Sequence, residues 1–376
     1  MLQIIPALDA GGAERTTIEV AGALAREGLA ALVASQGGRL EPDLAKAGGA
    51  LIRLPVAAKN PVAILANAFK LARIVRARNV KLIHARSRAP AWSAFMAARM
   101  TGVPFVATYH GIYNARSALK RLYNSVMARA DAVIANSEWT AAHIQDEYGF
   151  APKRLAVIPR GVDLALFDPG GVAPERVATL RASWKAADGM RIVLLPGRLT
   201  RWKGQHVFVE ALSQLAERGA LAGVCAVIAG DPQGRDDYAA GLADAIVENA
   251  LADVAMIAGH VADMPAAYLA ADIVVSASTD PEAFGRVAAE AQAMGRAVIA
   301  TDHGGARETV LPDVSGLLIP PGDAAALAGA LGTLLARDAD ALAAMGAAGR
   351  RHIATGYTVE RMCADTLLLY RALIGV

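Results

Sequence analysis

Two glutamates separated by seven residues are the most informative feature of the chain. Glu282 lies in a turn-like segment with Phe284 and Gly285, and Glu290 lies in an alanine-rich run that predicts a helix. Two carboxylates at this spacing on one helix would be about 12 Å apart along its axis, whereas the pair in a glycosidase is about 5 to 9 Å apart. We therefore expect the glutamates to hold different parts of one extended, hydroxyl-rich ligand, with any phosphate near the helix N-terminus after Gly285.

Polar or glycine-containing loops follow five strand-like runs in the second half of the chain, namely residues 191–196, 223–229, 254–258, 273–277 and 297–301. Ligands of open parallel sheets bind at the carboxyl ends of strands, so these are candidate binding loops. Arg198 and Lys203 on the first loop suit a diphosphate and would stabilise it as a leaving group. The following loops contain Gly230, His260 and residues 302–308. Ordinary solvated turns are the alternative interpretation.

The first half offers two further candidates. The segment Gly11-Gly12-Ala13-Glu14 would let the backbone approach a ligand before a helix N-terminus, although a tight strand–helix turn explains it equally well. It does not match the Gly-x-Gly-x-x-Gly dinucleotide fingerprint. His110 ends another strand-like run and could hydrogen-bond a sugar hydroxyl or a carbonyl. A structural histidine that caps a loop is the alternative.

Strand-like and helix-like runs alternate along most of the chain. This alternation predicts an α/β fold with two doubly wound, Rossmann-like domains that face a central cleft. Residues 1–165 are expected to form the first domain and residues 190–357 the second. The turn-rich residues 166–189 are predicted to be a linker, and a last helix at about 358–376 is expected to pack back on the first domain.

Composition excludes several classes of protein. Of the 376 residues, 55% are apolar and 19% are charged, so the chain can bury large cores and is not disordered. Cys225 and Cys363 lie far apart, which excludes a disulfide framework or a cysteine metal site and fits a reducing compartment. The histidines lack metal-ligand spacing. No run is long enough to span a membrane and the start does not resemble a signal peptide, so we expect a cytoplasmic protein.

Charge is distributed unevenly along the chain. Residues 1–165 have a net charge of +10 and residues 166–376 a net charge of −7. A basic half predicts an anionic partner, and the lack of interleaved aromatic residues favours an anionic membrane surface over nucleic acid. Residues 59–81 could bind lipid headgroups or an anionic acceptor, or form an ordinary covering helix with its lysines in water. The residues assigned to this acceptor or membrane side are Arg86, Arg88, Tyr109, Lys120 and Arg121.

Together these segments resemble the retaining GT-B glycosyltransferases of the large family that includes bacterial mannosyl- and glucosyltransferases of lipopolysaccharide and lipid-linked glycans. The resemblance covers nearly the whole chain. It is carried by Gly11-Gly12-Ala13-Glu14, Thr108-Tyr109-His110-Gly111, Gly197-Arg198 with Lys203-Gly204, Gly230-Asp231, the Glu282 and Glu290 pair, and Gly304-Gly305 with Glu308. Such enzymes are usually metal-independent and retain the anomeric configuration, by same-face attack assisted by the leaving phosphate.

The resemblance implies roles for individual residues. Arg198 and Lys203 would bind the donor diphosphate, and Glu290 would hold the ribose hydroxyls. Glu282 and the backbone of the next residues would face the donor sugar. His110 would lie near the reacting centre. The predicted catalytic residues are thus His110, Arg198, Lys203 and Glu282, and the predicted donor-binding residues are Gly12, Gly230, His260, Phe284, Gly285 and Glu290.

The chain departs from the family pattern at two points. Arg286 occupies a position that is often apolar, which allows an extra contact with a phosphate or the acceptor. The loop that begins Gly230-Asp231-Pro232 departs from the commoner Gly-Asp-Gly-Pro, so this loop does not identify the base of the nucleotide.

These observations predict a hexosyltransferase without a cofactor or metal, peripheral on the cytoplasmic membrane face. Its donor would be a nucleotide sugar, GDP-mannose or UDP-glucose, and its acceptor a glycolipid or oligosaccharide. The alternatives are a nucleotide-sugar epimerase on the same fold, a nucleotide-dependent oxidoreductase, which the missing dinucleotide fingerprint disfavours, and a non-catalytic sugar- or nucleotide-binding protein.

Overall fold

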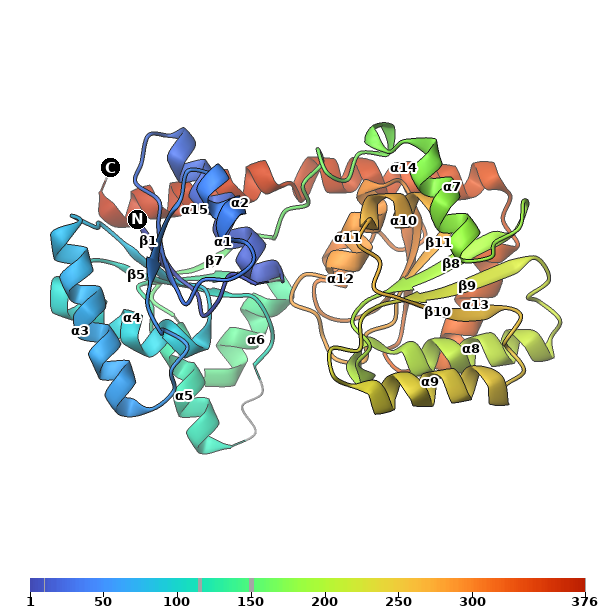
Figure 1. Ribbon diagram of the computed structural model, residues 1–376, viewed down its shortest axis with the longest axis horizontal. Coiled ribbons are helices and arrows are strands. Elements are labelled where there is room, and N and C mark those ends of the chain that lie inside the picture. The colour runs from blue at the N-terminus through green and yellow to red at the C-terminus, as the bar shows by residue number, and fades with distance from the viewer. Residues whose placement is uncertain (10, 114–116, 149–151, 376) are drawn as a thin grey trace. The chain divides into compact units, whose positions relative to one another are not determined.

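The computed structural model describes residues 1–9, 11–113, 117–148 and 152–375. Its contacts divide the chain into two compact units. The first unit comprises Met1–Gly161 and Val359–Val376, and the second comprises Val162–Thr358. Each unit is a parallel sheet with helices on both faces (Figure 1).

The first unit contains a seven-stranded sheet in the order β3-β2-β1-β4-β5-β6-β7, in which every adjacent pair is parallel. Its strands are β1 (Leu2–Ile4), β2 (Leu32–Ser35), β3 (Ala50–Arg53), β4 (Ile83–Ala85), β5 (Phe105–Tyr109), β6 (Ala132–Ala135) and β7 (Leu155–Val157). Its helices are α1 (Gly12–Arg26), α2 (Glu41–Lys46), α3 (Pro61–Ala77), α4 (Arg88–Thr101), α5 (Ala118–Ala128), α6 (Glu138–Tyr148) and α15 (Val359–Ile374).

The second unit contains a six-stranded sheet in the order β10-β9-β8-β11-β12-β13, also parallel throughout. Its strands are β8 (Arg191–Pro196), β9 (Val224–Ala229), β10 (Ala255–Gly259), β11 (Ile273–Ser276), β12 (Ala297–Thr301) and β13 (Gly316–Ile319). Its helices are η1 (Pro169–Gly171), α7 (Pro174–Ser183), η2 (Arg201–Lys203), α8 (Gln205–Glu217), α9 (Asp236–Glu248), α10 (Met264–Ala270), α11 (Arg286–Ala293), α12 (Ala306–Thr309), α13 (Ala324–Leu335) and α14 (Ala339–Gly356).

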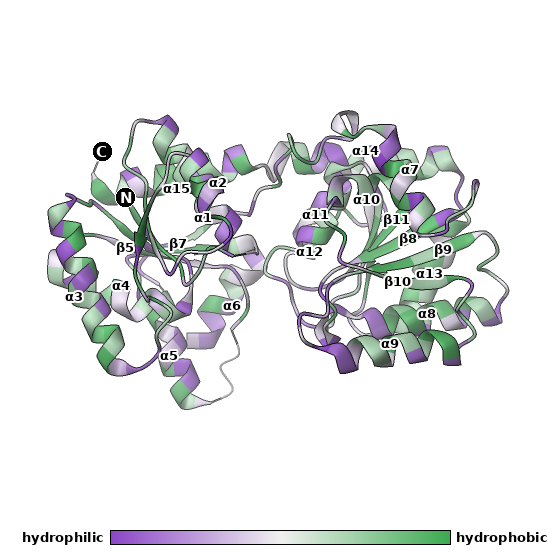
Figure 2. Ribbon diagram, in the orientation of Figure 1, coloured by the Kyte–Doolittle hydropathy of each residue, from purple (hydrophilic) through white to green (hydrophobic). Residues whose placement is uncertain are grey.

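Burial explains why the central strands read as continuous apolar runs. Every residue of β5, β9 and β12 is buried, because helices cover both faces of each sheet. In Figure 2 the labelled strand β9 is green, the colour of hydrophobic residues. Both strand orders change direction next to a central strand, at β1 and β4 in the first sheet and at β8 and β11 in the second. In doubly wound sheets such a switch point is where ligands bind.

Capping side chains begin several helices as their sequence predicts. Asn60 accepts a hydrogen bond from the backbone N–H of Ala63 at 2.7 Å and is followed by Pro61 at the first helical position. Asp338 likewise accepts from the N–H of Ala341 at 2.8 Å and begins α14. Asp338 is therefore the N-cap of this helix.

Residues 166–189 differ from the expected linker. They form η1 and α7 and lie in the second unit. Phe167, Val172 and Trp184 are buried in one apolar cluster with residues of β8 and α10. Arg176 of α7 also forms an ion pair of 2.6 Å with Asp263. The turn-rich composition is real, but three apolar side chains anchor the segment to the sheet.

The last helix, α15, packs on the first unit. Leu367, Leu369 and Tyr370 belong to the same buried cluster as Ile18 and Leu24 of α1. Within the described part of the chain, no helix combines the length and apolar character needed to cross a membrane.

Gly346 tests the close packing of α14 in the second unit. A Cβ at Gly346 would overlap the backbone carbonyl of Gly295. We therefore expect Gly346→Ala to lower the free energy of unfolding by about 1–3 kcal/mol through overpacking. Gly329 in α13 is the matched control, because nothing lies within 4 Å of its added Cβ. Gly329→Ala is expected to be neutral or stabilising by up to about 1 kcal/mol. Denaturation followed by circular dichroism measures the free energy of unfolding of both variants. Equal effects of the two substitutions would contradict the close packing of Gly346 on Gly295.

Candidate active site

The loops after β8 and β11 meet at the switch point of the second sheet. β8 pairs with β9 on one side and with β11 on the other, so the chain leaves these two neighbouring strands at the same sheet edge. A Cβ at Gly204, at the end of η2, would overlap the carbonyl oxygen of Ala277 at the end of β11. The backbone N–H of Thr279 also donates to the carbonyl of Trp202 at 2.8 Å. The two loops are thus fixed against each other.

Lys203 and Glu282 form an ion pair between these two loops. The Nζ atom of Lys203 lies 2.7 Å from Oε1 of Glu282, and the two side chains are 13% and 14% exposed. The hydroxyl of Ser278 donates to the same oxygen. Burial raises the pKa of Glu282, but the charge and hydrogen bond of Lys203, with the Ser278 hydroxyl, outweigh it and the net pKa is lowered. Glu282 is therefore ionised at neutral pH, and its Oε2 accepts no hydrogen bond from the described residues.

Gly230 sets the spacing between the loops after β8 and β9. A Cβ at Gly230 would overlap the carbonyl oxygen of Gly197, so only glycine permits this approach. The side-chain amide of Gln205 holds the carbonyl of Arg198 at 2.9 Å. The side chain of Arg198 is exposed and makes no ion pair among the described residues. The backbone of Arg198 is thus fixed at the strand edge, and its exposed side chain is open to an anion.

Glu290 is buried within α11 and already has two protein donors. The hydroxyl of Tyr268 donates to its Oε2 at 3.0 Å, and Nε of Arg286 donates to its Oε1 at 2.8 Å. Burial, followed by the charge of Glu290, raises the pKa of Tyr268 well above its usual range, so this hydroxyl remains a donor. Each carboxylate oxygen has two acceptor sites, so Glu290 keeps the capacity to bind ligand hydroxyls. Arg286, which departs from the family pattern, thus forms an ion pair with Glu290 one helical turn away.

The loop after β12 packs directly on the Glu282 segment. A Cβ at Gly304 would overlap the backbone of Glu282, and the N–H of Gly305 donates to the Glu282 carbonyl at 2.8 Å. Phe284 is buried, with its ring 6.1 Å from that of Tyr357. Its side chain therefore belongs to the core, which leaves the backbone next to Gly285 as the part that can reach a ligand.

The structure separates His260 from this group. It is exposed and follows β10, an edge strand that lies two strands away from β8. Sequence reasoning selected it because a glycine-containing loop follows a strand there, which does not reveal the position of that strand in the sheet. Ser278 was missed, and His303 was included only as part of the loop at residues 302–308 and not as a candidate of its own. Both follow strands β11 and β12, so the same strand-end signal could have found them.

In the first unit, Arg160 lies against the predicted glycine loop. Its guanidinium donates to the carbonyl of Gly12, and a Cβ at Gly12 would overlap the same guanidinium. Arg160 is only 8% exposed. It follows β7, far from Gly12 in the sequence, so no local signal predicted this contact.

His110 follows β5 with unmet hydrogen-bonding capacity. Neither ring nitrogen is open to solvent or has a hydrogen-bond partner among the described residues. Burial, together with the charges of Arg86 and Arg160, holds the pKa of His110 well below its usual value. The imidazole is therefore neutral at pH 7 and offers one donor and one acceptor.

Two residues assigned to the acceptor or membrane side are buried. Arg86 is 2% exposed and its Nε donates to Oε1 of Gln3 at 2.9 Å. Tyr109 is buried with its ring 5.3 Å from that of Tyr113. Neither side chain can face a membrane, and a role of these two residues on the acceptor side stays a prediction. A buried amide acceptor satisfies Arg86, which its charge alone did not reveal.

The other three residues of that assignment lie nearer the surface. The guanidinium of Arg88 lies 4.1 Å from the ring centre of Tyr113. Lys120 is exposed in the first turn of α5, and Arg121 is exposed and paired with Glu147 at 3.2 Å.

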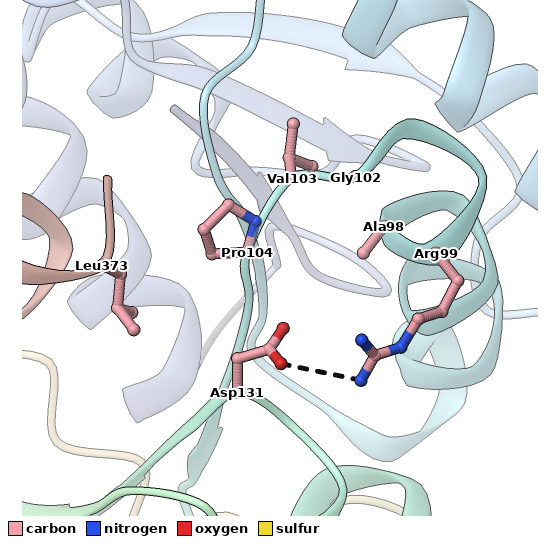
Figure 3. A pocket seen from close by; sticks show the side chains of 7 residues that line it. All are labelled: Ala98, Arg99, Gly102, Val103, Pro104, Asp131 and Leu373. Carbon is pink, nitrogen blue, oxygen red and sulfur yellow. Dashed lines mark ion pairs between the residues drawn. The ribbon is translucent and has the colours of Figure 1, made fainter. Parts of the chain in front are cut away.

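A pocket of about 370 Å³ lies elsewhere in the first unit (Figure 3). Pro104 and Asp131, which line it, directly precede β5 and β6, so it opens at the amino ends of the strands. Asp131 is already paired with Lys153 at 2.9 Å and with Arg99 at 3.6 Å. None of the residues predicted to carry chemistry lines this pocket. Within the described residues, no group of three or more His, Cys, Asp or Glu side chains is arranged to hold a metal ion.

Comparison with known proteins agrees with this geometry. Residues 10–166 match the family model described as Glycosyltransferase Family 4, and residues 190–337 match the one described as Glycosyl transferases group 1. A D-inositol 3-phosphate glycosyltransferase of Acidothermus cellulolyticus is 30% identical over 357 residues, which cover 87% of this chain and 78% of that protein. The enzyme of the same name from Geodermatophilus obscurus is 35% identical over 257 residues, covering 66% of this chain. The match spans only 54% of the length of the Geodermatophilus protein.

Solved structures share the fold of the whole chain. A glycosyltransferase from Rickettsia africae superposes with a TM-score of 0.90 at 35% identity and covers 99% of this chain and 98% of its own. The Anabaena protein HepE, solved in complex with UDP, gives a TM-score of 0.86 at 25% identity and covers 99% of both chains. The protein therefore belongs to the glycosyltransferases that the two family models describe, and its two parallel sheets form the GT-B fold.

Proposed function

We propose that the protein is a retaining hexosyltransferase that moves a hexose from a nucleotide sugar to a lipopolysaccharide-core or lipid-linked glycan acceptor. The observation that carries this proposal is the largely buried ion pair between Lys203 and Glu282 at the switch point of the second sheet. A cation and a carboxylate at this edge match a ligand that has both a diphosphate and hydroxyls.

The donor diphosphate would bind beside Lys203 and Arg198. Both cations would stabilise the negative charge that develops on the leaving phosphate as its bond to the anomeric carbon breaks. The acceptor hydroxyl would form the new bond from the same face and release its proton to the leaving phosphate oxygen. No metal is required for this charge balance, because the two cations and the N-terminus of α11 supply positive potential. The HepE structures contain UDP and UDP-glucose, which favours a uridine nucleotide here over a guanosine nucleotide.

The acceptor would bind on the first unit. Arg160 places a largely buried cation on the Gly12 loop at the N-terminus of α1, which suits a phosphate-bearing acceptor. The relatives named for inositol phosphate fit the same chemistry. His110, as a neutral imidazole, could hydrogen-bond a hydroxyl of either substrate. The epimerase alternative gains no support from the family models or from these relatives.

Exposed apolar side chains support a membrane-bound acceptor. Val62, Leu65 and Phe69 are exposed on one face of α3, and Leu119 and Leu122 are exposed on α5. Both helices pack against α4. Figure 2 shows hydrophobic and hydrophilic residues alternating along α3. The exposed cations that accompany these side chains are Lys59, Lys70, Arg73, Lys120 and Arg121. Apolar side chains among cations suit the interface of an anionic membrane.

UDP is expected to raise the melting temperature more than GDP or ADP does, because a ligand that binds only the folded state stabilises it by mass action. At one hundred times its Kd, the nucleotide would contribute about 2.7 kcal/mol. Thermal scans with UDP, GDP, ADP and NAD, each with and without a chelator, measure this. A shift with GDP alone would identify a guanosine donor. A shift with NAD alone would overturn the transferase proposal.

Replacing Lys203 by alanine is expected to lower kcat/KM about 10²- to 10³-fold, since a preorganised charge on the leaving group is lost. The assay is release of nucleoside diphosphate from the nucleotide sugar. Arg201→Ala is the matched control, because it removes an exposed cation from the same short helix and should leave the rate nearly unchanged. Near wild-type turnover in Lys203→Ala would remove this residue from the mechanism.

Vesicles that contain phosphatidylglycerol should bind the protein, and binding should weaken steeply as salt rises. Phe69→Ser and Leu119→Ser should each reduce cosedimentation at low salt. Val247→Ser is the control, because Val247 is equally exposed but lies on α9 of the second unit. Absent or salt-insensitive binding, or an equal effect of the control, would contradict the membrane proposal.

A further inference from the structure

His303 has unmet hydrogen-bonding capacity beside Glu282. Both ring nitrogens are closed to solvent, and neither has a hydrogen-bond partner among the described residues. A buried polar group without a partner lowers stability, and native proteins contain few such groups. The pKa of Glu282, which burial raises and Lys203 and Ser278 lower, is also lowered by His303, so the imidazole lies close to this carboxylate.

The backbone fixes the position of His303. Its N–H donates to the carbonyl of Thr301 at 2.8 Å. The next two residues, Gly304 and Gly305, pack so tightly on the Glu282 segment that a Cβ on either would overlap its backbone. His303 as a residue is only partly buried, so part of it lies at the surface of the unit. The side chain is therefore held at the strand edge but is not locked by a partner.

The combination of groups selects a hydroxyl as the ligand. A histidine ring can donate a hydrogen bond from a ring N–H, and the ionised Glu282 offers an acceptor at Oε2. A sugar hydroxyl both donates and accepts, so it can donate to the carboxylate and accept from the imidazole. A phosphate oxygen would meet the negative charge of Glu282. Phosphate is instead matched by Lys203 and Arg198 on the neighbouring loop.

We propose that His303 is a specificity-determining residue that, together with Glu282, reads a hydroxyl of the transferred sugar. The inference rests on the proposed function, because it requires a nucleotide-sugar donor in the second unit. It assigns His303 to the sugar alone and not to the nucleotide. His303→Ala should therefore weaken recognition of the sugar and leave the affinity for the free nucleoside diphosphate unchanged.

The test measures donor use and nucleotide affinity in the same variants. With the full donor, kcat/KM should fall about 10- to 100-fold in His303→Ala, while Kd for the nucleoside diphosphate stays within about twofold. In the wild type, one member of a series of monodeoxy donors should be used poorly. In His303→Ala, that deoxy donor and the full donor should be used almost equally. His303→Gln keeps a donor and an acceptor and should recover part of the discrimination.

Control variants keep the result decisive. His206→Ala removes another partly buried histidine of the second unit and should change neither quantity. Equal loss of nucleotide affinity and sugar discrimination in His303→Ala would overturn the inference, as would an undiminished penalty for every deoxy donor. If His303→Ala does not fold, an unchanged deoxy penalty in His303→Gln and His303→Asn would overturn it. Failure of the wild type to bind any nucleoside diphosphate would instead refute the proposed function.

Discussion

The ion pair between Lys203 and Glu282 is the interaction on which the candidate site depends. Removing two charges from water is costly, and their attraction offsets this cost only when their geometry is fixed. The fixed geometry comes from Gly204, which lets its loop approach the carbonyl of Ala277 at the end of the adjacent strand. The parallel pairing of β8 with β11 brings both loops to one edge. The strand order, the glycine and the ion pair are thus parts of one constraint.

Sequence reasoning identified the central strands because they are buried on both faces and therefore read as apolar runs. It missed β3, β7 and β13, which are all edge strands with partly exposed residues. Because most residues of these three strands are only partly buried or exposed, these short strands lack a marked apolar run. The turn-rich segment 166–189 misled for a related reason. Its anchoring to the second unit depends on a few buried side chains, such as Phe167 and Trp184, whose contacts exist only after folding.

The candidate site was predictable as a list of residues but not as a set of contacts. Lys203 and Glu282 were recognised separately, because each follows a predicted strand, whereas their pairing depends on the strand order. Arg160 contacts Gly12 although the two residues are far apart in the sequence of the first unit, and no local pattern at either residue indicates this contact. Charge misled at Arg86, because a buried amide can satisfy a guanidinium as well as water does.

The two units repeat one arrangement. In each sheet, the strand beside the switch-point pair is followed by a histidine, His110 after β5 and His303 after β12. Both histidines have two ring nitrogens without partners among the described residues. One such ring could reflect loose packing. A buried imidazole without hydrogen-bond partners occurs at equivalent positions of two different sheets. Buried polar groups that lack partners are found mainly at functional sites, which argues that each imidazole binds a ligand. A sugar hydroxyl can hydrogen-bond an imidazole without adding charge to either unit.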